Sequence, residues 1–413
     1  MAAYPLYGFQ FLLPRLSLPD VLGLLAVGMW LLHRMILPCE VHRIQWASTV
    51  LLFPMALVLS GVVAAIDDGR FDVSFGPLAR SVFAVLVFCA ASGVARKEGF
   101  ARRLTYAWLA SGTLVAILAI AQVLAFNLRG DFRLYIPPTN LTYERAGNPG
   151  VSLGGGLSLF RGVGTLPEPS WLATFLSPIL IGCAGTMAAH LAAGRRRLAA
   201  RLGPVFLILA AGVISSLSLV GWLSAAIALG VVIAKVGRSK RAMAGSMLTL
   251  GVLIGTLYTA VPARLREVAT HYVGSRAGAV VGGRDPSLSM RVRGLDLALR
   301  CYASYPILGA GPNRFPHFAR STGHQVDVTV NNSFLLLAAE TGTVGLTLLL
   351  VFGWRLFSAA VSVNDNDRQL SGGNLFAWAG VGFLLANLFN NHWYALDLWI
   401  SAGVLSARGS KIA

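Results

Sequence analysis

The sequence contains little charge and almost no lysine. Charged residues make up 12% of the 413 residues, whereas hydrophobic residues make up 55%. Soluble domains carry about twice that charged fraction, so the composition excludes an ordinary soluble domain. A bilayer core of ~30 Å needs roughly 20 apolar residues per crossing helix, and such runs recur along the chain. The sequence therefore predicts an all-α, polytopic membrane helix bundle.

Cysteine and the common cofactor motifs are also scarce. Cys39, Cys89, Cys183 and Cys301 lie far apart, and without a CxxC spacing they indicate neither a zinc site nor a disulfide framework. No HExxH, P-loop, GxSxG or dinucleotide fingerprint occurs. No cationic segment precedes the first apolar run, so the start is not typical of a cleaved signal peptide. We expect neither a metal nor a cofactor.

The net charge is nevertheless +17. No basic stripe with interleaved aromatic residues lies on a soluble domain, so we expect no nucleic-acid partner. In a membrane protein such charge reflects basic loop ends and contacts with anionic lipids or substrates.

The apolar runs predict about eleven membrane helices in one integral domain, 1–413, or twelve if the first 18 residues insert. The run 203–236 would extend ~50 Å as a helix, too long for one crossing, so we divide it at 215–221. The predicted spans are about 20–37, 46–66, 77–95, 104–126, 170–191, the two halves of 203–236, 243–261, 333–357, 374–390 and 393–405.

Basic residues orient these spans. The short loops around 96–103, 195–201 and 235–241 are rich in Lys and Arg, and such loops remain in the cytoplasm. The long loops 127–166 and 262–332 then face the extracytoplasmic side. All four lysines fall on the cytoplasmic side.

The loop 262–332 carries the most unusual composition. Between Val261 and Phe334 lie nine arginines, four acidic residues and no lysine. The planar guanidinium presents a fork of donors that fits phosphate and carboxylate. This loop therefore predicts a site for an anionic, phosphate-bearing substrate.

A first candidate site is RGVGTLPEPSWLA, residues 161–173. Glu168 lies between two prolines where a loop becomes a membrane helix, and Ser170 is a suitable N-cap. Charges near membrane depth are costly and seldom without function. We therefore favour functional roles for Glu168 and Arg161, against the alternative that Glu168 caps the helix and Arg161 pairs with it.

A second candidate site is residues 289–315. The helical spacing of Arg291, Leu295, Leu299 and Tyr302 predicts a helix, with Arg293 and Arg300 on another side of it. PILGAGPNRF, which contains Arg314, then ends the helix and brings backbone amides close to whatever binds. The alternative for its glycines is a plain turn.

A third candidate site is NNSFLLLAAETGTVGL, residues 331–346. Asn331 and Asn332 can cap the next span, and Gly342 and Gly345 can allow close helix packing. Glu340 lies within the span, where we expect a buried polar role, structural or functional. Among the histidines of the outer loops, His324 is a candidate general base, although a lone histidine is more often simply exposed.

These three segments together resemble the bacterial O-antigen ligase and polymerase superfamily, which consists of integral membrane enzymes with a GT-C-like fold. The matching patterns are RxxGxxxEPSxxA at 161–173, R…A…P.lG.G…F at 291–315 and (H/N)NsfL…E.G..G at 331–345. Ligases of the family usually carry His where this chain has Asn331, and the EPS element is more typical of polymerases. The resemblance therefore favours a polymerase of O-antigen or exopolysaccharide repeats.

The resemblance implies an inverting, metal-independent transfer of glycan from a polyprenyl diphosphate to a sugar hydroxyl. It implies a bacterial inner-membrane enzyme whose site faces the periplasm. Arg161 and Arg291, then Arg300 and Arg314, would stabilise the departing diphosphate. Glu168 or His324 would orient or deprotonate the acceptor, and Asn331 and Asn332 would hold the acceptor or cap the site.

Alternatives differ in acceptor or in class. A ligase would transfer the glycan to lipid A-core, and a transporter would flip the lipid-linked oligosaccharide. A transporter should carry charge along its spans, whereas the charge here concentrates in outer loops, which favours an enzyme. Membrane lipids and the lipid-linked oligosaccharide are the expected partners, together with chain-length or export proteins.

The predicted orientation can be tested by cysteine labelling from outside, in a chain that lacks its native cysteines. Ser275→Cys and Gly147→Cys should be modified by an impermeant maleimide, and Arg197→Cys should not, because its loop is short and basic. Modification of Arg197→Cys alone would reverse the orientation.

Overall fold

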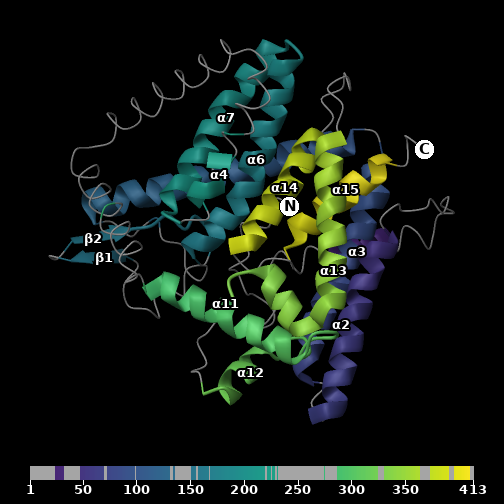
Figure 1. Cartoon of the computed structure of the whole chain (residues 1–413). Coiled ribbons are helices and arrows are strands. Elements are labelled where there is room, and N and C mark those ends of the chain that lie inside the picture. Colours follow the sequence, from purple (N-terminus) through teal and green to yellow (C-terminus); the bar gives the residue numbers. More distant parts are fainter. Residues whose placement is uncertain are drawn as a thin grey trace. The chain divides into compact units, whose positions relative to one another are not determined.

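A computed structural model describes residues 24–31, 47–68, 72–97, 99–130, 134, 150–154, 157–166, 168–218, 221–224, 226–227, 230, 274, 286–323, 330–362, 373–389 and 395–409. Helices account for nearly all of these residues (Figure 1). They are α2 (Ala47–Asp68), α3 (Asp72–Ala95), α4 (Phe100–Arg129), α6 (Pro169–Ala192), α7 (Arg196–Ser215), α11 (Pro286–Ser304), α12 (Phe315–Ser321), α13 (Ser333–Ser362), α14 (Gly373–Phe389) and α15 (Leu396–Gly409).

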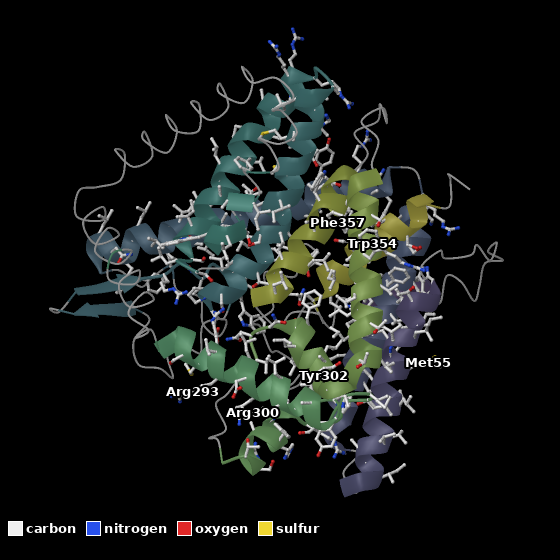
Figure 2. All side chains as sticks on the ribbon, in the orientation of Figure 1. Met55, Arg293, Arg300, Tyr302, Trp354 and Phe357 are labelled. Atoms are coloured by element: carbon white, nitrogen blue, oxygen red, sulfur yellow. The ribbon has the colours of Figure 1, made fainter. Side chains whose placement is uncertain are left out.

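The predicted helical membrane fold is confirmed. Helices α2, α3, α4, α6, α7 and α13 are long and apolar enough to cross a membrane, and α14 and α15 contain shorter apolar stretches. Met55 on α2 and Trp354 and Phe357 on α13 are 62%, 67% and 44% exposed (Figure 2). Lipid tails would cover such side chains in a bilayer. The total of eleven or twelve spans stays a prediction, because several of them lie outside the described residues.

One element within the loop 127–166 is not helical. Strands β1 (Gly150–Gly154) and β2 (Leu157–Phe160) form an antiparallel hairpin. The division of the run 203–236 agrees with the structure, because α7 ends at Ser215 and helix resumes at Gly221.

The chain divides into two compact units. Unit 1 comprises residues 1–21, 102–285 and 363–382, and unit 2 comprises residues 22–101, 286–362 and 383–413. Our expectation of a single integral domain stays a prediction.

In unit 1, α6 is an almost fully buried helix, with 89% of its span inside. A Cβ atom on Gly182 would lie 2.7 Å from the carbonyl oxygen of Leu375, so α14 approaches α6 closely there. Trp108 of α4 stacks on Phe376 of α14, with ring centroids 5.5 Å apart. Small residues and stacked rings are what packing between membrane helices requires.

In unit 2, a buried cluster joins α11, α12 and α13. Leu297 and Cys301 of α11 pack with Phe315 and Ala319 of α12 and with Ala339 of α13. The arginine-bearing helix α11 is therefore fixed on the first part of a membrane-spanning helix.

Helix α13 is broken at Gly342, whose φ of 64° and ψ of −160° are not helical. In an unbroken helix the N–H groups of Thr343 and Val344 would donate to the carbonyls of Ala339 and Glu340. The break releases all four of these backbone groups. Inside a membrane protein each of them needs another partner, because an unpaired backbone group in hydrocarbon costs several kcal/mol.

The segment 306–311, which follows α11, supplies these partners. Two of its carbonyls accept the released donors, and two of its N–H groups donate to the released carbonyls. The four bonds run from Thr343 N to Pro306 O (2.8 Å), Val344 N to Ile307 O (3.4 Å), Ala310 N to Ala339 O (2.9 Å) and Gly311 N to Glu340 O (3.0 Å). The segment 306–311 thus pairs the backbone groups that the break in α13 leaves open, and the same four bonds fix the segment on α13.

Two glycines permit this approach. Gly309 has a φ of 73°, and a Cβ atom there would lie 2.2 Å from the carbonyl carbon of Glu340. A Cβ atom on Gly342 would lie 2.2 Å from the carbonyl oxygen of Ile307. The expectation that Gly342 serves helix–helix packing is wrong, because its close neighbours belong to the loop and not to another helix.

Gly309→Ala should therefore destabilise the protein far more than Gly323→Ala. Gly323 has a similar φ of 81° but nothing within 4 Å of its added Cβ. A left-handed backbone costs alanine roughly 1–2 kcal/mol at either position. The overlap at Gly309 should bring its loss to about 3 kcal/mol or more.

Thermal unfolding of the two purified variants measures this difference. Equal losses at the two positions would show that the loop does not press against α13.

Candidate functional site

The segment 160–164, which carries Arg161, is held against α4 by a buried amide side chain. The Oε1 atom of Gln122 accepts the N–H groups of Val163 (3.2 Å) and Gly164 (2.8 Å). Its Nε2 atom donates to the carbonyl of Gly164 (2.8 Å). Gln122 is 3% exposed, so this contact replaces the water that the segment's backbone groups would otherwise need.

A second amide side chain of α4 holds the start of the same segment. The Oδ1 atom of Asn127 accepts the N–H group of Phe160 (3.0 Å), and its Nδ2 atom donates to the carbonyl of Phe160 (3.2 Å). The side-chain amide thus pairs with the backbone at the end of β2 as a neighbouring strand would.

Arg161 itself is directed to the end of α7. Its Nε atom donates to the carbonyl of Ser216 (3.0 Å), and the next N–H group, that of Gly162, donates to the carbonyl of Ser215 (2.8 Å). No ion pair joins Arg161 to Glu168, both of which the structure describes, so that alternative is wrong. The contact brings the loop 127–166 to the turn that divides the run 203–236, and the predicted topology puts both on one side.

Glu168 begins α6, but its side chain does not cap the helix. The residue occupies the N-cap with an extended backbone, and no capping hydrogen bond forms from its carboxylate. The expected N-cap, Ser170, is instead the second helical residue, and its hydroxyl donates to Oε2 of Glu168 (3.0 Å). The carboxylate is half-buried. Glu168 is thus the N-cap residue, but its carboxylate makes no capping hydrogen bond and therefore keeps acceptor capacity for a ligand.

The arginines of α11 lie on different sides of it, as predicted. Arg293 and Arg300 are exposed and two turns apart on one face (Figure 2), whereas Arg291 is half-buried on another. The Nε atom of Arg300 lies 2.9 Å from Oδ2 of Asp296, and these side chains are 67% and 56% exposed. Such a pair within one helix contributes about 0.3–0.5 kcal/mol, so a stronger anion can displace the aspartate.

The buried face of α11 does not coincide with the residues whose spacing predicted the helix. Leu297, Ala298 and Cys301 form it, whereas Leu299 is 52% exposed. The thiol of Cys301 donates to the carbonyl of Ala339 (3.6 Å). Burial, with a smaller contribution from Glu340, raises the pKa of Cys301 to about 12, so this thiol stays protonated at neutral pH.

Arg314 precedes α12 and is buried, with 7% of its surface exposed. The side chain lies over Gly311, where an added Cβ atom would come within 2.6 Å of Cδ of Arg314 and of Cβ of Ala64. Gly311 has a φ of 105°. The turn therefore needs glycine there both for its conformation and for the space that the arginine fills.

The backbone amides of this turn point to α13. Those of Ala310 and Gly311 donate to carbonyls of α13, and those of Asn313 and Phe315 donate to the carboxylate of Glu340. The expectation that these amides approach a bound phosphate is therefore wrong. All four amides have acceptors within the protein, and the two carbonyls among these acceptors are those released by the break in α13.

Asn332 caps α13, as expected. Its Oδ1 atom accepts the N–H group of Leu335 (2.9 Å), and its Nδ2 atom donates to the carbonyl of Leu388 at the end of α14 (3.0 Å). Asn331 is half-buried beside it. His324 lies outside the described residues.

The candidate residues thus fall into two groups. Arg161 and Glu168 belong to unit 1, 7 residues apart in sequence, and the remaining described candidates belong to unit 2. The second group consists of Arg291, Arg300, Arg314, Asn331 and Asn332. Among the described ranges, no three His, Cys, Asp or Glu side chains gather as metal ligands would.

Sequence reasoning missed the side chains that hold these groups in place. Gln122 lay within the predicted span 104–126 and Asn127 at the start of the predicted loop 127–166, both without an assigned role, and the role of Glu340 was left open. A signal did exist, because polar side chains within an apolar span are rare and usually have a specific partner. The identity of that partner, a backbone segment far along the chain, carries no sequence signal.

Comparison with protein families matches residues 204–350 to the family described as O-antigen ligase. The matched range contains α11, α12 and the break in α13, and thus the entire arginine-bearing segment. A comparison with curated proteins finds no match.

Proposed function

We propose that this chain, of which residues 204–350 match the family described as O-antigen ligase, is a membrane glycosyltransferase that polymerises lipid-linked oligosaccharide repeats. The donor is a glycan on polyprenyl diphosphate, and the acceptor is a sugar hydroxyl of a second repeat unit. The reaction needs no metal and no cofactor. The enzyme lies in the bacterial inner membrane with its site towards the periplasm.

One observation carries this proposal. An arginine-bearing helix and turn, 291–314, are joined by backbone hydrogen bonds to the first part of α13, which the predicted topology puts on the outer side of the membrane. The diphosphate of a lipid-linked donor also lies at the membrane surface. Guanidinium groups bind phosphate oxygens in a fixed geometry. A backbone held by hydrogen bonds positions these groups before the substrate binds.

The arginines act on the leaving group. The acceptor oxygen attacks the anomeric carbon of the donor, the bond from that carbon to the diphosphate oxygen breaks, and polyprenyl diphosphate departs. Negative charge grows on the departing oxygen, and Arg291, Arg300 and Arg314 stabilise it there. Arg161, which belongs to unit 1, is a further candidate for stabilising the departing diphosphate.

Glu168 or His324 acts on the acceptor. A carboxylate that is half-buried and not used as a cap can take the proton of the attacking hydroxyl, and Glu168 satisfies this description. Asn331 orients the acceptor sugar. Asn332, which caps α13, fixes the backbone next to Asn331.

A ligase that transfers the glycan to lipid A-core is the second candidate, because the matched family is described as O-antigen ligase. Asn331 in place of the histidine usual in ligases, and the EPS element at 168–170, support polymerisation. Chain-length and export proteins are the partners that a polymerase requires.

Purified protein supplied with lipid-linked repeat units distinguishes these functions. The proposal predicts a ladder of polymers that grows by one repeat per step, without added metal and in the presence of a chelator. A single transfer to added lipid A-core would show a ligase. Absence of any transfer, with the lipid-linked units moved across a vesicle membrane instead, would show a transporter.

Glu168→Gln should lower turnover by roughly 100-fold or more, the usual effect of losing a general base. Glutamine keeps the size of the side chain but cannot take a proton at neutral pH. Ser170→Ala is the matched control: it removes the hydroxyl that donates to Oε2 and leaves the carboxylate, so its turnover should fall only a few-fold.

Turnover, donor affinity and melting temperature are measured on the same preparations. Turnover of Glu168→Gln close to that of the wild type would remove this residue from the mechanism and leave His324 as the base.

A further inference from the structure

We propose that Glu340 is a positioning residue: its carboxylate holds the turn that carries Arg314 in the orientation that meets the donor diphosphate. The part that concerns the donor rests on the proposed function. The part that concerns the turn rests on hydrogen bonds within unit 2 alone.

Glu340 is the buried residue to which several segments attach. It is 6% exposed and lies two residues before the break in α13. Its carbonyl accepts the N–H group of Gly311 (3.0 Å) and the hydroxyl of Ser60 from α2 (2.7 Å). Its carboxylate accepts the N–H groups of Asn313 and Phe315. Main chain and side chain of one residue thus fix both ends of the turn 311–315.

The chemistry of the turn calls for a carboxylate. Phe315 is the first residue of α12, and the N-cap residue Arg314 provides no side-chain cap, so the N–H groups here need an outside acceptor. Asn313 has a φ of 61°, a left-handed conformation that persists in a non-glycine residue when its surroundings hold it. A carboxylate has two acceptor oxygens, whereas an amide has one and would turn its NH₂ group towards a donor.

Arg314 lies between the two clamped amides. Its side chain packs over Gly311 and is almost fully buried, so it cannot swing to compensate for a displaced backbone. A shift of the turn therefore becomes a shift of the guanidinium. Because phosphate binding by Arg depends on a fixed fork geometry, donor affinity should depend on Glu340 even though the carboxylate does not touch the donor.

A merely structural role of Glu340 makes different predictions. If the role is merely structural, substitution of Glu340 lowers stability throughout unit 2. The loss of donor affinity from that substitution then adds to the loss from removing Arg314. A positioning role acts through Arg314, so the two effects should not add.

The first test is site-resolved amide hydrogen exchange on the full chain in lipid nanodiscs. In Glu340→Gln, the amides of Asn313 and Phe315 should exchange about tenfold faster or more, because an acceptor oxygen is lost. The amides of Ala310 and Gly311 donate to carbonyls and should keep their wild-type rates. Unchanged exchange rates at 313 and 315, or equal acceleration at all four positions, would show that the carboxylate of Glu340 does not hold the turn.

The second test is binding of geranylgeranyl diphosphate, a short polyprenyl diphosphate, by wild type, Glu340→Gln, Arg314→Ala and the double variant. Glu340→Gln should weaken binding roughly tenfold, as the loss of one charge-assisted hydrogen bond would. In the Arg314→Ala background it should change affinity less than about twofold. Additive losses would overturn positioning through Arg314.

Tyr302→Phe is the matched control. Its hydroxyl bonds to Thr343 at the same junction (2.8 Å) and not to Glu340. Exchange at 313 and 315 and affinity for the probe should therefore both stay unchanged. If Glu340→Gln does not fold, Glu340→Asp, which keeps the charge on a shorter arm, should show the same changes. Failure of the wild type to bind geranylgeranyl diphosphate would refute the proposed donor. The hydrogen-exchange data would still show whether Glu340 holds the turn 311–315.

Discussion

The break in α13 is the constraint on which the arrangement of unit 2 depends. A non-helical residue inside a membrane-spanning helix leaves four backbone groups to be paired, and hydrocarbon offers no partner for them. The segment 306–311 supplies all four partners. The glycines at 309 and 342 are there because the two backbones meet where a side chain would stand. The arginines of α11 and Arg314 are thereby held at fixed positions relative to α13, a helix long and apolar enough to cross the membrane.

In unit 1 the backbone groups of a loop segment are paired by side-chain amides instead of by a broken helix. Its loop segment 160–164 is held by two amide side chains, Gln122 and Asn127, each of which donates and accepts at once. In both units polar groups of a span hold a backbone segment rather than a ligand. In the proposed function, Arg161 of the segment 160–164 and Arg300 of α11 are the charged side chains that act on the substrate.

The sequence predicted what depends on composition and local periodicity. Apolar runs gave the membrane helices, the spacing around Arg291 gave α11, and Asn332 proved to be a cap. It misjudged details that depend on tertiary contact. Ser170 suits an N-cap, yet the helix begins at Pro169, two residues earlier than a cap at Ser170 would give, so that Glu168 occupies the N-cap position. The glycines of PILGAGPNRF suggested that its backbone amides approach a phosphate, whereas those of Ala310 and Gly311 donate to carbonyls released by the break at Gly342. No sequence feature near the turn indicates that break.

The docking of the loop into the break is tested most directly by cross-linking. Ile307 and Val344 are 69% and 37% exposed and share a backbone hydrogen bond. With cysteine at both positions in a chain free of native cysteines, a short bismaleimide should join them and leave the protein folded. The control pair of Ile307→Cys with Leu350→Cys, also exposed but six residues or ~9 Å further along α13, should not be joined. Equal cross-linking of both pairs, or of the control pair alone, would contradict the account.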